Sequence, residues 1–261
     1  MSVERMQALM AAPNTFSRNG ERLTPIDRQV LDLTWESLTD YGQELFARRA
    51  FQPEGQAEGD PSHTFRHELA VGGLVLSATE NPDAAVAAAL HDTGKGRSRV
   101  RELISSPVAI MDMTEEERNT IRSHAAFGSE DLEGAIKDPA LGELARFVAA
   151  NHHTLYPAAP DPGERPFWEV TGMVRTGDIS QAILLDWRRQ YKAARMAREG
   201  LINQDGYPIM DAIMEVVIPE SERGRSYMGV PVTAVVEAAV QHMPTPEFIR
   251  DRLEQIRRQA A

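Results

Sequence analysis

Residues 82–92, PDAAVAAALHD, constrain this chain most, because an almost wholly apolar segment ends in two polar side chains that bind metals well. Asn81 followed by Pro82 is a typical helix start, with an N-cap residue and a proline in the first turn. A helix so rich in alanine and valine has no polar face for water, so we expect it to be buried. It therefore delivers His91 and Asp92 into the protein interior.

Apolar residues recur at helical spacing along most of the chain, and helix-start signals accompany them. Thr114 with Glu117 forms a capping box ahead of His124. Residues 51–60 are predicted to form a loop, and residues 215–232 a short hairpin. Helices are predicted over about 25–49, from Asp60-Pro61, from 115 through 124, from Asp138-Pro139 to 153, over about 167–198 and over about 232–259. The sequence thus predicts an all-α fold.

Composition narrows the classes of function. The chain has 261 residues and no cysteine, which excludes disulfides, thiolate zinc sites and cysteine nucleophiles. A net charge of -11 disfavours a broad basic face for extended nucleic acid. The N-terminus lacks the apolar run of a signal peptide, and no 18-residue apolar stretch is present. We expect a cytoplasmic protein with no membrane segment.

Six of the seven histidines fall between residues 63 and 153, at or near inward-facing helical positions. His152 continues an apolar stripe of its helix, and Asp178 lies on a similar stripe. A single inward histidine is more often a hydrogen-bonded core residue than a ligand, but six in this order favour a metal site. The adjacent His91 and Asp92 suit two neighbouring ions, because one carboxylate can bridge both through its two oxygens.

The order of these residues, centred on HDTGK at 91–95, resembles the HD superfamily of metal-dependent phosphohydrolases over about residues 60–200. The chain looks most like the HD-GYP phosphodiesterases, which hydrolyse cyclic di-GMP at a two- or three-metal centre. In that family the double histidine is followed by a glutamate and a Gly-Tyr-Pro loop, of which only Tyr156-Pro157 remains here. The resemblance implies these metal ligands: His63, His67, His91, Asp92, His124, His152, His153 and Asp178.

Basic residues follow the ligands. Lys95 lies one turn beyond His91 and Asp92, where it can neutralise charge on a phosphoryl group, and Arg97 is the nearest arginine to it. Arg189 and Lys192, with Tyr191 between them, look like the family's group that contacts substrate phosphates. We therefore expect Lys95 and Asp92 as catalytic residues, and Lys95, Arg97, Arg189 and Lys192 as substrate-binding residues.

These observations predict an HD-domain helical bundle over 60–200, with helical extensions over 1–59 and 201–261. The expected function is hydrolysis of a cyclic dinucleotide or related nucleotide through a metal-activated hydroxide, with two or three divalent ions, iron or manganese. The spacing of 24 residues between His67 and His91 resembles HD-fold diiron oxygenases such as myo-inositol oxygenase, which keeps an oxygenase open as the alternative. A CRISPR-type HD nuclease and a non-catalytic nucleotide sensor also remain open, as does a homodimer.

Overall fold

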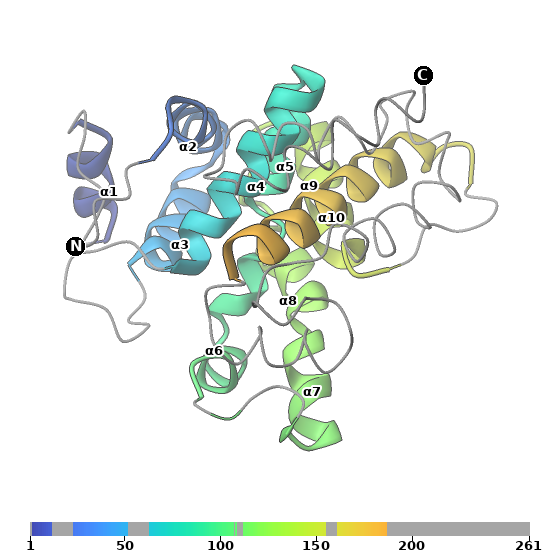
Figure 1. The fold of residues 1–261 in the computed structure, drawn as a ribbon. Coiled ribbons are helices and arrows are strands. Elements are labelled where there is room, and N and C mark those ends of the chain that lie inside the picture. The colour runs from blue at the N-terminus through green and yellow to red at the C-terminus, as the bar shows by residue number, and fades with distance from the viewer. Residues whose placement is uncertain are drawn as a thin grey trace, which may run out of the picture. The chain divides into compact units, whose positions relative to one another are not determined.

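A computed structural model describes residues 2–11, 23–51, 63–106, 108, 112–154 and 161–186. The chain divides into two compact units, Met1–Val174 and Arg175–Ala261. The described residues form helices and one isolated β-bridge, with no strand among them, so the predicted all-α fold class is confirmed (Figure 1). No helix in these ranges is long and apolar enough to cross a membrane. The predicted boundaries near 60 and 200, the hairpin and the tail helices lie outside the described residues.

Two helices, α4 (His63–Thr79) and α5 (Pro82–Ala89), form the centre of the first unit and pack against each other. The side chain of Asn81 accepts hydrogen bonds from the first amides of α5, as the sequence predicted. Every residue from Ala84 to Ala89 is buried. Helix α2 (Pro25–Ser37) packs on both central helices, and α9 (Pro139–Asn151) packs on α5. The polar end of α5 is thereby enclosed.

The single helix predicted over about 25–49 is wrong, because the structure has two helices there. Leu38 is extended and forms the β-bridge with Ile136, and α3 (Asp40–Ala50) begins after it. Thr39 caps α3, its side chain accepting from the amide of Gly42 at 3.2 Å. Helix α1 (Ser2–Ala11) packs on α3. The apolar spacing continues across the break, which explains why periodicity alone did not reveal it.

The helix predicted to carry His124 is also divided. The Thr114–Glu117 capping box is present and opens α7 (Glu115–Arg122), but α7 ends at Ser123, and His124 begins α8 (His124–Asp131). Upstream lie a 3₁₀ turn, η1 (Thr93–Gly96), and α6 (Ser98–Ile104); η1 packs on α8. Helix α10 (Arg165–Asp186) starts in the first unit and continues into the second.

Candidate metal centre

The carboxylate of Asp92 lies at the middle of a buried group of histidines. Its side chain is 1% exposed, and its two oxygens face different imidazoles. Oδ1 lies 3.1 Å from Nε2 of His124 and 3.5 Å from Nε2 of His152. Oδ2 lies 3.3 Å from Nε2 of His91 and 3.8 Å from Nε2 of His67. One carboxylate therefore joins two sets of nitrogen donors, as expected from the adjacent His-Asp pair.

Three histidines are oriented by the same hydrogen bond, from Nδ1 to the backbone carbonyl three residues earlier. Nδ1 of His91 lies 2.7 Å from the carbonyl of Ala88, and Nδ1 of His152 lies 2.9 Å from that of Ala149. In His124 the corresponding contact with Ile121 is 2.6 Å. A carbonyl oxygen only accepts, so each Nδ1 carries the proton and donates it. The neutral ring then presents the lone pair of Nε2 toward Asp92.

Those lone pairs form a site that suits a cation. Nε2 of His124 lies 3.2 Å from Nε2 of His152 and 3.1 Å from Nε2 of His153. Where the unprotonated Nε2 atoms of His124 and His152 face each other beside a carboxylate oxygen they repel one another, and a bound cation relieves that repulsion. Asp92, His124, His152 and His153 each offer a ligand atom within 4.8 Å of the others. This donor set fits a divalent transition metal.

Two buried groups of the centre have shifted pKa values. Burial raises the pKa of Asp92, but the neighbouring His91 and Lys95 outweigh it and hold the pKa well below its usual range. Burial lowers the pKa of His152, more than Asp92 raises it, so this imidazole is neutral at neutral pH. An ionised carboxylate and a neutral imidazole are the forms that bind metals.

Two glycines bring the Asp92 turn against α8. A methyl group added at Gly94 would overlap the carbonyl oxygen of His124 and the backbone of Gly128. At Gly128 the nearest atoms to such a group would be the amide nitrogen of Gly94, at 3.2 Å, and the Cβ of Ala149, at 3.4 Å. The glycine of HDTGK thus lets η1 approach the helix that carries His124.

Of the predicted basic residues, two are described. Lys95 is 22% exposed and its ammonium forms an ion pair with Oδ2 of Asp92. Arg97 instead contacts α8, through Asp131 at 2.7 and 3.1 Å and Glu130 at 3.2 Å, with its guanidinium over the ring of Phe127. In this structure Arg97 therefore ties the end of η1 to α8, and its contact with substrate stays a prediction.

The roles of the remaining predicted site residues stay predictions. His63 begins α4, but its side chain is outside the described part of the chain. Asp178 is half-buried on α10 and belongs to the second unit. Tyr156-Pro157 and the predicted phosphate-contacting residues Arg189, Tyr191 and Lys192 lie outside the described residues.

A buried ion pair between α3 and α4 was not predicted from the sequence. Nε of Arg49, on α3, lies 3.2 Å from Oε1 of Glu68, on α4, and the side chains are 3% and 2% exposed. The pKa of Glu68 is raised, because the effect of burial exceeds the lowering by Arg49. The available signal was a glutamate directly after His67, between the apolar residues Phe65 and Leu69. Nothing in the sequence pointed to Arg49 as its partner.

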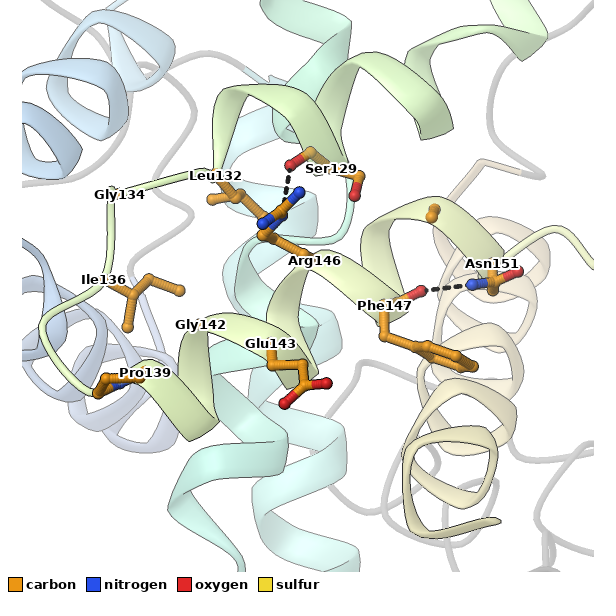
Figure 2. A pocket seen from close by; sticks show the side chains of 11 residues that line it. Ser129, Leu132, Gly134, Ile136, Pro139, Gly142, Glu143, Arg146, Phe147 and Asn151 are labelled. Carbon is orange, nitrogen blue, oxygen red and sulfur yellow. Dashed lines mark hydrogen bonds between the residues drawn. The ribbon is translucent and has the colours of Figure 1, made fainter. Parts of the chain in front are cut away.

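A pocket of about 710 Å³ lies on the first unit, formed by α9 and the turn that precedes it (Figure 2). Arg146 crosses it and donates to the carbonyl of Ser129 at 3.2 Å, and Phe147 lines it. No predicted metal ligand is among its lining residues. His152 projects from the end of the same helix into the buried histidine group, so this pocket and the metal ligands are separate features.

Comparison with known proteins agrees with this geometry. The family model of the HD domain matches residues 64–199, which is about half of the chain. The match includes all of the described histidines around Asp92. No curated protein and no solved structure matches the chain. With a His/Asp group suited to a divalent ion at its centre, the chain belongs to the HD domain family, whose members are generally metal-dependent hydrolases.

Proposed function

We propose that this protein is a metal-dependent phosphodiesterase that hydrolyses a cyclic dinucleotide or a related nucleotide at the group around Asp92. The observation that carries the proposal is that the two oxygens of Asp92 face separate sets of imidazole nitrogens. Such a carboxylate is suited to bridge two divalent ions, iron or manganese. The chemistry that bound ions supply is Lewis acidity, which activates water and polarises a phosphoryl oxygen.

The candidate ligands can be assigned to individual ions. His67 and His91 would hold one ion and His124, His152 and His153 the other, with Asp92 shared. We propose Asp178 as a further metal ligand, on the strength of the family resemblance and of its place on the helical stripe that includes Val174. His63, four residues before His67, is the candidate ligand for a third ion.

Substrate access is proposed at the exposed members of the group. His153 is exposed and Lys95 is 22% exposed, whereas His91, Asp92 and His152 are fully buried. A phosphodiester approaching there meets the Lys95 ammonium, which can neutralise charge that develops on the phosphoryl oxygens. Arg189 and Lys192 are proposed to bind the remaining phosphates, on the strength of the family resemblance.

The test is metal analysis combined with turnover. Protein loaded with manganous or ferrous ions is expected to contain two or three ions per chain and to hydrolyse bis(p-nitrophenyl) phosphate and a cyclic dinucleotide. Asp92→Asn and His152→Ala should lose both the metal and the turnover, while His242→Ala, outside the matched residues, should keep both. Loaded protein that hydrolyses no phosphoester would refute the proposal.

Two other results would identify the alternatives. Oxygen consumption by the ferrous protein without phosphoester hydrolysis would indicate the oxygenase, which uses the same ligand types. A nucleotide that raises the melting temperature and is recovered unchanged would indicate a sensor. Either result would replace the phosphodiesterase proposal.

A further inference from the structure

The turn η1, which carries Lys95, packs on α8 and contacts it at two places. Within the turn, Gly94 lies so close to α8 that an added methyl group would overlap the carbonyl oxygen of His124 and the amide of Gly128. Directly after the turn, Arg97 reaches the other end of α8 with its side chain. Lys95 therefore lies between two attachments of η1 to α8.

The guanidinium of Arg97 is held by three side chains of α8. Its pairing with Asp131 is bidentate, because Nη2 lies 2.7 Å from Oδ1 and Nε lies 3.1 Å from Oδ2. Nη2 also lies 3.2 Å from Oε2 of Glu130, and the guanidinium carbon lies 5.1 Å from the centroid of the Phe127 ring. A planar guanidinium paired at two points is fixed in direction as well as in distance.

These contacts favour a role for Arg97 other than binding a substrate phosphate. A phosphate that approached the guanidinium would be repelled by the carboxylates of Glu130 and Asp131, and it would have to displace the bidentate pair. Lys95 differs, because its ammonium extends from the same turn to the Asp92 carboxylate in the metal centre. The position of that ammonium depends on how η1 lies against α8.

We propose that Arg97 is a positioning residue, whose ion pair with Asp131 holds η1 on α8 and thereby sets where the Lys95 ammonium meets a substrate phosphate. The contact of Lys95 with substrate rests on the proposed function. The close approach at Gly94 limits how near η1 can come to α8, and the bidentate pair at Arg97 limits how far the turn can swing away from it.

Removing each partner in turn distinguishes positioning from phosphate binding. Arg97→Gln and Asp131→Asn should each lower kcat/KM for bis(p-nitrophenyl) phosphate about 10-fold, because misplacing a catalytic group by about 1 Å can cost up to about 100-fold. The double variant should be no worse than either single variant, since all three lack the same ion pair. Arg99→Gln removes an exposed ion pair with Glu102 on α6 and should leave kcat/KM unchanged. An Asp131→Asn protein with unchanged or higher kcat/KM would overturn the proposal, because freeing Arg97 helps only if Arg97 binds the phosphate.

Amide hydrogen exchange tests the attachment of η1 without any substrate. The amide of Lys95 donates to the carbonyl of Asp92 at 2.9 Å, and that of Arg97 to the carbonyl of Gly94 at 3.2 Å. In Asp131→Asn both amides should exchange up to about 5-fold faster, as expected for loss of a partly exposed ion pair, while amides in the middle of α2 keep the wild-type rate. Unchanged exchange would overturn the positioning role and leave the phosphodiesterase proposal intact. Faster exchange, in a protein whose wild type hydrolyses no phosphoester, would support the attachment of η1 and overturn the phosphodiesterase.

Discussion

Substituting Gly94 by alanine tests whether the HDTGK turn must touch α8 for the site to form. The added methyl group would overlap two backbone positions, the carbonyl oxygen of His124 and the amide of Gly128. Backbone atoms cannot rotate aside like a side chain, so η1 and α8 must separate. Overpacking of this kind costs about 1–3 kcal/mol, and the upper end applies when the backbone must move. In a chain of this size that lowers the melting temperature by roughly 2–4 °C per kcal/mol.

Gly142 provides a control, because the same substitution there should raise the free energy of unfolding. It lies inside α9, and a methyl group added there meets only the Cβ of Ile136, at 3.8 Å. Gly142→Ala should therefore stabilise the protein by about 0.5–1 kcal/mol, because alanine restricts the unfolded chain more than glycine does. Thermal unfolding followed by circular dichroism, with bound metal counted in each variant, decides the matter. Gly94→Ala protein as stable as wild type, with full metal content, would refute the reasoning.

Three further predictions concern charged groups. Arg97→Ala and Asp131→Asn should each lower the free energy of unfolding by a similar amount, up to about 1 kcal/mol, because their ion pair is partly exposed. A double-mutant cycle measured by urea unfolding should show that the two effects are coupled, and additive effects would contradict the ion pair. Hydrogen bonds from the backbone amide and the side chain of Thr114 hold the pKa of Glu117 below its ordinary value, so the capping box contributes at neutral pH and is lost as pH falls through that lowered pKa. The NMR signal of the Thr114 amide should shift over the same pH range, and an amide signal that does not shift with pH would count against the box. Mn²⁺ at 100 times its Kd should stabilise the wild-type protein by about 2.7 kcal/mol and therefore raise its melting temperature. The melting temperature of Asp92→Asn should not rise, and equal shifts in the two proteins would show that the ion binds elsewhere.

Local signals predicted the helix starts well. Asn81 and Asp138 cap α5 and α9 because a short side-chain oxygen satisfies free amides within its own segment. The stripe of Leu141, Ala145 and Val148 leading to His152 is buried as expected, since helical spacing alone places those residues on one face. Information that resides within one turn of helix can be recovered from the sequence.

Features that depend on distant segments could not be recovered. The break at Leu38 exists because its backbone pairs with Ile136, almost a hundred residues later, while the apolar spacing continues without interruption. Glu68 looked like an ordinary helical glutamate until Arg49 appeared as its partner from another helix. The histidines themselves could be selected from the sequence, but which oxygen of Asp92 each faces is set by helix packing.

The distribution of the imidazoles along the chain has a consequence for how the protein matures. His67 and His152 are about 85 residues apart, and the donors between them come from separate helices. Closing loops of that length in an unfolded chain is entropically unfavourable, so the unfolded chain does not hold these ligands together as a binding site for a free ion. The helices must dock before the nitrogen lone pairs converge. We therefore expect the metal ions to bind last, after the protein has folded. Metal content would then measure the fraction of molecules in which all the ligand-bearing helices are docked.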